Sequence, residues 1–167
     1  MIRFSPEALR AVLAALPKAT AYWIAFSGGQ DSRVLLHALA ALRYALEGPL
    51  QAAHVNHGLH ADAASWAQAC TETCEHHAIP LSVVQLDARN PVGDSPEAWA
   101  RERRYRALEA LMHEGEMMLT AHHRDDQAET LLMQLLRGSG PRGLAGMPRL
   151  VRWGSGWLAR PLLAFDR

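Results

Sequence analysis

Short apolar runs of strand length alternate with longer segments of helical periodicity over most of the chain. The apolar runs cover residues 21–27, 50–56, 81–87 and 116–121. In the segments that follow them, apolar side chains recur every three or four positions, which predicts helices over residues 32–46, 62–78, 95–114 and 125–137. Strands that alternate with helices favour right-handed crossovers and a parallel sheet covered on both faces. The pattern therefore predicts an α/β fold with a doubly wound, Rossmann-like parallel sheet.

The tripeptide Ser-Pro-Glu opens two of the helical segments, at residues 5–7 and 95–97. Serine suits the N-cap, proline the first helical position and an acid the first turn. Residues 1–20 are therefore expected to hold an ordinary helix rather than a signal peptide. The chain also lacks a run of about 18 apolar residues, which a membrane-spanning helix needs. These features predict a cytoplasmic protein without a membrane segment.

The pattern changes after residue 137. Residues 137–143 are rich in glycine and predict a loop, and residues 150–153 and 157–160 flank a Gly-Ser-Gly turn, as in a β-hairpin. We therefore divide the chain into a main domain, residues 1–148, and a short C-terminal hairpin, residues 149–167. No closing element follows the hairpin, so the sequence is either the end of a small protein or the cut edge of a larger one, and we favour the cut edge, with a linker starting within residues 149–167.

Composition and charge change this picture little. The sequence has 17 basic and 17 acidic residues, so its formal net charge is zero and any nucleic-acid contact must rely on a local basic patch. All the basic residues except Lys18 are arginines. Cys70 and Cys74 lie four residues apart in a predicted helix, and we expect them to be reduced and buried.

The strongest chemical signal is the segment Ser-Gly-Gly-Gln-Asp-Ser at residues 27–32, between a predicted strand and a helix. In doubly wound sheets ligands bind at the carboxyl ends of the strands, where a helix N-terminus offers amides and a positive dipole end to phosphate. Gly28 and Gly29 let the backbone approach an anion. Asp31 would repel that anion unless a cation lay between them, which indicates Mg²⁺. The competing interpretation is a plain turn with an Asp-Ser helix cap.

The segment at residues 27–32 lacks the lysine and spacing of a Walker loop and resembles the pyrophosphate loop of the N-type ATP pyrophosphatases. Those enzymes share a doubly wound fold and cleave ATP into an adenylate and pyrophosphate. Further segments resemble one branch of that superfamily, the tRNA(Ile)-lysidine synthetases, in order over residues 21–163. They are His-Val-Asn-His-Gly-Leu at 54–59, Ala-Arg-Glu-Arg-Arg-Tyr at 100–105, Ala-His-His-Arg-Asp-Asp-Gln-Ala-Glu-Thr at 121–130 and the glycine-rich stretch at 137–147.

The resemblance implies a ligase that uses ATP and Mg²⁺. Such an enzyme adenylates the wobble cytidine in the CAU anticodon of tRNA(Ile) and then couples free L-lysine to C2, releasing pyrophosphate and AMP. It implies that residues 1–148 form a PP-loop catalytic domain in which Asp31 positions Mg²⁺. It also implies that residues 149–167 lead through a linker to C-terminal domains that help to recognise the tRNA. The expected ATP-binding residues are Ser27, Gly28, Gly29, Gln30, Asp31 and Ser32 in the loop, and His54, Val55 and Asn56 around the adenosine.

Two arginines and two histidines are further candidates for the chemistry, together with Asp31. Arg101 and Arg104 share a helix face, either as a solvated surface or as a clamp that stabilises the leaving pyrophosphate. His122 and His123 follow the fourth strand; we take His123 as the phosphate contact, although one of the pair is alternatively a core histidine.

An acidic helix start is the candidate lysine site. Asp126 and Glu129 share a helix face, and the resemblance implies that they hold the lysine substrate, although acids there also compensate the helix dipole. Zinc is not expected at His54, because no cysteine or carboxylate completes a site. His57 and His60 have either a structural or a functional role. The glycine-rich residues 138–146 are a candidate lid.

Two alternatives to the ligase remain. One is another PP-loop enzyme that modifies tRNA through adenylation, such as a thiolase, although Cys70 and Cys74 do not have suitable spacing for its chemistry. The other is a module that binds ATP without catalysis. One departure from the family pattern is Arg33, which stands where a small hydroxyl residue is usual and adds positive charge near the phosphates.

Overall fold

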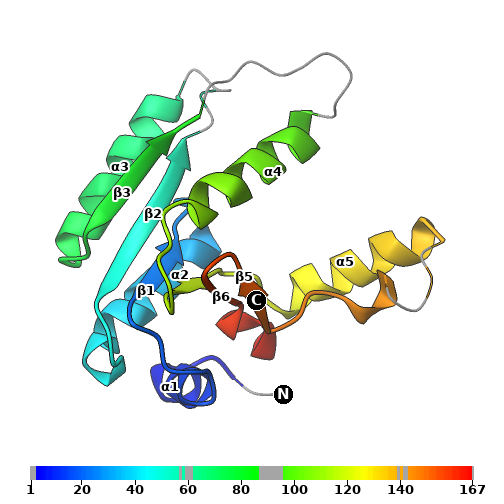
Figure 1. Cartoon of the computed structure of the whole chain (residues 1–167), viewed down its shortest axis with the longest axis horizontal. Helices are drawn as coiled ribbons and strands as arrows, with labels where there is room; N and C mark the ends of the chain where they lie inside the picture. Colours follow the sequence, from blue (N-terminus) through cyan, green and yellow to red (C-terminus); the bar gives the residue numbers. More distant parts are fainter. Residues whose placement is uncertain are drawn as a thin grey trace.

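The helices and strands follow the predicted alternation in a computed structural model, which describes residues 3–56, 58, 62–86, 96–138, 140 and 143–166 (Figure 1). The α-helices are α1 (Pro6–Ala14), α2 (Gln30–Ala41), α3 (Ala63–His76), α4 (Pro96–Glu109) and α5 (Arg124–Leu136). The strands are β1 (Tyr22–Ala25), β2 (Leu50–Asn56), β3 (Leu81–Gln85), β4 (Met117–Leu119), β5 (Leu150–Trp153) and β6 (Gly156–Ala159). Short 3₁₀ helices occupy η1 (Arg43–Ala45), η2 (Gly143–Ala145) and η3 (Pro161–Ala164).

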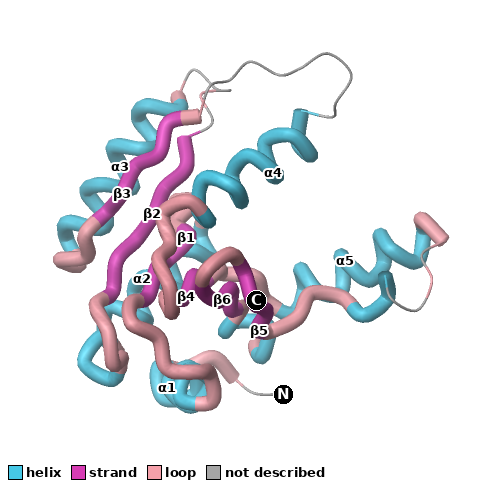
Figure 2. Tube along the Cα trace, viewed as in Figure 1, coloured by secondary structure: helices cyan, strands magenta, loops and turns pink. Residues whose placement is uncertain are grey.

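The strands form one sheet in the order β3-β2-β1-β4-β6-β5 (Figure 2). Neighbouring strands from β3 to β6 run parallel, and only β5 pairs antiparallel, with β6. The predicted doubly wound α/β fold with a C-terminal hairpin is confirmed. The hairpin adds to the main sheet because β6 pairs with β4, and the division of the chain at residue 148 stays a prediction.

The central strands are buried on both faces, as a parallel sheet between helix layers requires. Along β1, Tyr22 and Ile24 belong to the core cluster that includes residues of α1, α2 and α3. Trp23, between them in sequence, belongs to the cluster on the other face, with Leu108 of α4. This alternation explains why the sequence of β1 is a continuous apolar run.

Some element boundaries differ from the prediction. Helix α2 begins at Gln30 rather than Ser32, which places Asp31 in its first turn. It ends at Ala41 rather than at residue 46, and the chain then turns through η1. In this turn the guanidinium of Arg43 donates hydrogen bonds to the backbone carbonyls of Ala40 and Ala78. The sequence pattern also missed η3, whose residues are all buried.

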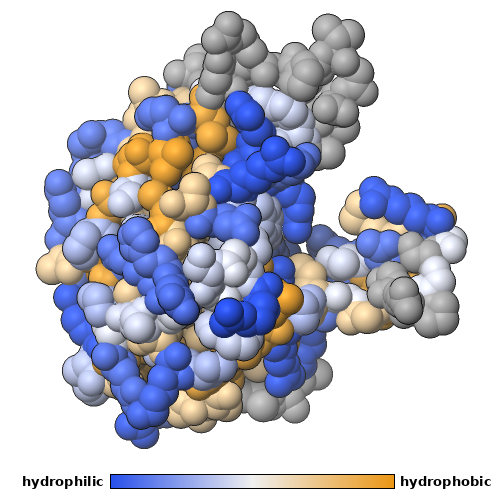
Figure 3. Space-filling view, viewed as in Figure 1, coloured by the Kyte–Doolittle hydropathy of each residue, from blue (hydrophilic) through white to orange (hydrophobic). Residues whose placement is uncertain are grey.

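Helix α5 projects from the body of the molecule in the space-filling view (Figure 3). Its second half exposes large apolar side chains, which include Leu132, Met133, Leu135 and Leu136. Cys70 and Cys74 are free and buried, as predicted, and Trp99 is also buried. Among the described helices, none combines the length and the apolar character that crossing a bilayer requires.

Candidate functional site

The carboxyl ends of β1, β2 and β4 surround a cavity of about 360 Å³. The chain leaves β1 toward β2 on one side, whereas β4 lies on the other side, so the cavity sits at the topological switch point of the sheet. Its volume is in the range of small-ligand sites. The predicted site residues that line it are Ser27, Gly29, Asp31, Ser32, His54, Val55, Asn56, Arg104 and Asp126.

The loop from β1 to α2 is held in shape by its own hydroxyls. Ser32 Oγ lies 2.9 Å from the Gly29 carbonyl, to which it donates, and 3.1 Å from Ser27 Oγ. Gly28 has φ +81°, and a Cβ on it would lie 2.7 Å from Cys70 Sγ, so a side chain there would strain the loop and strike α3. Arg33 Nε donates to the Gly28 carbonyl, which gives the unusual arginine a structural role in supporting the loop.

The end of β2 forms the wall beside this loop. His54 Nδ1 lies 2.9 Å from the Phe26 carbonyl. A carbonyl only accepts, so Nδ1 carries a proton and donates it to this oxygen. The side chain of Asn56 fastens the strand end to the start of α3, since Nδ2 donates to the Ala63 carbonyl and Oδ1 accepts from the Gly58 amide.

The segment after β4 places its two histidines differently. His122 lines the cavity, and its Nδ1 lies 2.9 Å from Thr120 Oγ1. His123 is buried and is not among the lining residues; its Nε2 lies 3.7 Å from Asp31 Oδ2 and 3.6 Å from Asp126 Oδ2. The structure thus brings His122 to the cavity, while His123 stands between the two carboxylates. The sequence analysis took His123 as the phosphate contact, whereas His122 is the histidine that lines the cavity; the sequence offered no signal that separates the two.

The candidate arginines and acids are also divided by the structure. Arg104 lines the cavity, and burial lowers the pKa of its guanidinium, whereas Arg101 is exposed with its guanidinium 5.2 Å from the ring centre of Tyr105. Asp126 lines the cavity and its Oδ2 accepts from the backbone amide of His123, which caps α5. Glu129 is exposed and is not among the lining residues, nor are Gly28 and Gln30. His57 and His60 lie outside the described residues, as does part of the candidate lid.

Sequence reasoning missed two aromatic walls of the cavity. Trp66 near the start of α3 lines it although the prediction named only the strand end beside it. Tyr105 is half-buried and packed edge-on against Trp153, and it also lines the cavity. The position of Tyr105 one residue after Arg104 was the only available signal.

The donor groups at the loop suit Mg²⁺ bound together with a phosphate ligand. The ion favours one or two carboxylates, with phosphate oxygens and water completing its shell. Asp31 supplies a carboxylate that is about one third exposed, at the end of the cavity that carries the N-terminus of α2. Among the described residues, no cluster of three histidine, cysteine or acidic side chains forms a metal site by itself.

The pKa of His122 predicts a pH-dependent stability. Burial lowers it from 6.5 to about 4, helped by the positive charge of Arg160. Between these values the unfolded chain binds a proton that the folded chain does not. The contribution of His122 to the free energy of unfolding is therefore fully present above pH 6.5 and is lost as the pH drops toward 4. The loss should be about 3 kcal/mol from this group. Urea unfolding of His122→Asn should show a flatter pH dependence over this window, whereas the exposed His113→Asn should match the wild type; equal slopes in all three would contradict the assignment.

The sequence matches the model of the PP-loop domain over residues 5–167. It is 50% identical over 163 residues to a tRNA(Ile)-lysidine synthase of Alkalilimnicola ehrlichii, covering 98% of this chain and 37% of the relative. It is also 50% identical over 156 residues to the enzyme of that name from Pseudomonas aeruginosa, covering 93% of this chain and 35% of that protein. The chain thus spans little more than a third of the length of the curated relatives it matches.

A solved structure supports the fold independently. A U34-tRNA thiolase from Methanococcus maripaludis, solved with its [4Fe-4S] cluster, superposes with a TM-score of 0.80 over 95% of this chain and 57% of its own. Sequence identity is 20%, so this likeness bears on the arrangement of the strands and helices alone.

Proposed function

The chain belongs to the PP-loop domain family, and on that premise we propose that it is the ATP-binding catalytic domain of a tRNA(Ile)-lysidine synthetase. Its substrates are then ATP, free L-lysine and tRNA(Ile) with a CAU anticodon. The observation that carries the proposal is the meeting of three groups in one cavity: the loop at residues 27–32, Arg104 on α4 and Asp126 on α5. They suit phosphate, developing negative charge and an ammonium, respectively.

The chemistry explains why one site needs all three. The C2 oxygen of cytosine is a poor leaving group, so it first attacks the α-phosphorus of ATP, forming an O–P bond while the bond to pyrophosphate breaks. The lysine amine then attacks C2 and loses a proton to solvent as the C–N bond forms. The C2–O bond breaks, and AMP leaves with the former C2 oxygen.

The residues take roles that follow from their charge and position. The amides at the start of α2 and the hydroxyl of Ser27 bind the phosphates, while the Ser32 hydroxyl supports the loop through the Gly29 carbonyl. Arg104 stabilises the charge on the departing pyrophosphate, because its permanent charge is partly desolvated. Asp31 would hold Mg²⁺, which when bound screens the phosphate charge.

The remaining groups orient the second step. Asp126 holds the ammonium of the incoming lysine. His123, between the carboxylates of Asp31 and Asp126, keeps both in place. His122 presents a neutral imidazole to the cavity at pH 7, since burial and neighbouring arginines lower its pKa to about 4.

The two cysteines do not support the thiolase alternative. Cys70 and Cys74 are about 1% exposed, and burial raises the pKa of both thiols, that of Cys74 to about 11. Neither is therefore a thiolate at neutral pH, the form in which cysteine attacks or binds metal.

The proposed function is tested by measuring the release of pyrophosphate and of AMP by the complete gene product. Pyrophosphate release should require ATP, Mg²⁺ and tRNA(Ile), and AMP release should require lysine in addition. A synthetase that adenylates only in the presence of its RNA gives no pyrophosphate without tRNA. Binding of ATP with no turnover under any of these conditions would instead favour the ATP-binding module.

A further inference from the structure

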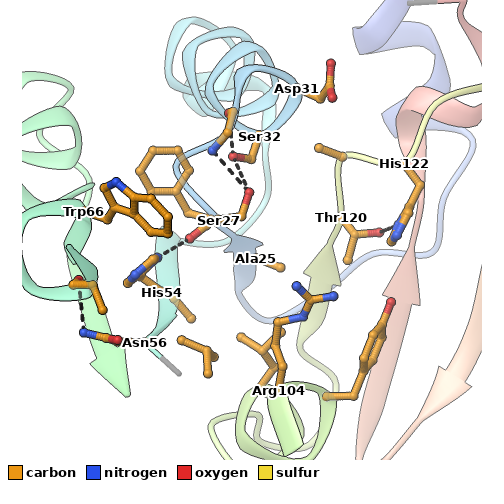
Figure 4. Close-up of a pocket in the computed structure, with 18 of the residues that line it drawn as sticks. Ala25, Ser27, Asp31, Ser32, His54, Asn56, Trp66, Arg104, Thr120 and His122 are labelled. Carbon is orange, nitrogen blue, oxygen red and sulfur yellow. Dashed lines mark hydrogen bonds between the residues drawn. The ribbon is translucent and has the colours of Figure 1, made fainter. Parts of the chain in front are cut away.

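The cavity has two sides that differ in polarity, and the loop of residues 27–32 lies between them. On the β4 side the lining is mostly polar or charged, with Thr120, His122 and Asp126 beside Ala121. On the β2 side it is mostly apolar; the lining residues there include Phe26, Ala53, Val55, Ala63 and Trp66. Figure 4 shows Trp66 beside His54 on the β2 side, across the cavity from Thr120 and His122. A ligand with phosphates at the loop and one flat apolar group fits with that group on the β2 side.

Trp66 occupies a helix position that normally belongs to the core. Trp66, Cys70 and Cys74 are spaced i, i+4 and i+8 on α3, so they follow one stripe of the helix. Cys70 and Cys74 are about 1% exposed against the sheet, whereas Trp66 is 55% exposed. The apolar stripe of α3 therefore continues past the packed part of the sheet and overhangs the cavity. An indole left exposed in a cavity wall offers a face on which a flat ring can stack.

We propose that Trp66 is the stacking platform for the adenine of ATP and so helps to select a nucleotide over free polyphosphate. The inference rests on the proposed ATP-binding function of the cavity. Adenine is favoured over a base of the RNA because Trp66 lies on the apolar side next to the phosphate loop, whereas the charged groups for the coupling step lie on the other side. Neighbouring His54 forms a firm wall there, since Nδ1 is fixed to the Phe26 carbonyl.

If Trp66 stacks on the adenine, its substitution should lower the affinity for ligands that carry the base and leave the affinity for phosphates alone unchanged. Removal of an aromatic platform under a base typically weakens binding by roughly 5- to 100-fold. Trp66→Leu should therefore weaken the binding of ATP and of AMP by about tenfold while the affinity for pyrophosphate stays within twofold. Trp66→Phe keeps a smaller ring, so its affinity for ATP and AMP should lie between those of the wild type and Trp66→Leu. Tyr44→Leu, which removes a ring that is 81% exposed in η1, away from the lining residues, should change none of these affinities.

The experiment is calorimetric titration of wild type and variants with ATP, AMP and pyrophosphate, each with Mg²⁺, after circular dichroism has shown equal helix content. ATP should also quench the tryptophan fluorescence of the wild type, and most of that quenching should be absent in Trp66→Phe. An ATP affinity of Trp66→Leu within twofold of the wild type would overturn the stacking role, as would an equal loss for pyrophosphate. A wild type that binds neither ATP nor pyrophosphate would instead refute the proposed function.

Discussion

Asp31→Asn is expected to lower the rate of pyrophosphate release by at least about 100-fold at saturating ATP and Mg²⁺. Asp31 lies in the first turn of α2 and lines the cavity. In the proposed function its carboxylate would hold the Mg²⁺ that screens the triphosphate. The asparagine keeps the size of the side chain but removes its charge, so the packing of the loop should survive. The loss therefore reports on metal binding rather than on folding.

The sign of the Mg²⁺ effect separates this role from simple damage to the loop. Without Mg²⁺, Asp31→Asn should bind ATP at least as tightly as the wild type, because the variant lacks a negative charge beside the phosphates. With Mg²⁺, only the wild type should gain affinity, by about tenfold or more. Asp125→Asn is the matched control, an exposed acid in the first turn of α5 that does not line the cavity. Weaker ATP binding by Asp31→Asn in both conditions would contradict the assignment to Mg²⁺.

The doubly wound fold was predictable because burial on both faces of the sheet leaves a continuous signature in the sequence. Segment 50–56 matches β2 at both ends, because it places apolar side chains on both faces of the sheet: Leu50 and Ala52 on one, Ala53 and Val55 on the other. The antiparallel hairpin was also predictable, from the Gly-Ser-Gly turn between two short apolar runs. The position of η3 was not, because four apolar residues after a proline carry no periodicity that separates a 3₁₀ turn from a strand.

The site was predictable as far as the topology of a parallel sheet dictates which segments meet. The loop at residues 27–32 and the end of β2 follow parallel strands, and the carboxyl ends of such strands meet at one edge. The sequence did not separate His122 from His123, because the choice depends on how the chain turns between β4 and α5. Trp66 was missed for a related reason, since whether a stripe position is core or cavity wall depends on where the sheet ends.

Asp126 and Glu129 were predicted together as the lysine site, and the structure makes their expected effects unequal. Asp126 lines the cavity, whereas Glu129 is exposed one turn farther along α5. A carboxylate that contacts the substrate ammonium makes a charged hydrogen bond, and its loss typically corresponds to about 10- to 100-fold in affinity. A carboxylate that only compensates the helix dipole contributes nothing to lysine binding.

Asp126→Asn should therefore raise the KM for lysine in AMP release by about 10- to 100-fold, while Glu129→Gln raises it less than threefold. Stability should change little in either variant, because the asparagine oxygen still accepts the backbone amide of His123 that caps α5. Pyrophosphate release, which precedes lysine attack, should keep its dependence on ATP in both, so the defect is confined to the second step. If the two substitutions raise the KM for lysine equally, both carboxylates contact the substrate. If neither changes it, the acids of α5 serve only its cap and dipole, and the lysine site lies elsewhere.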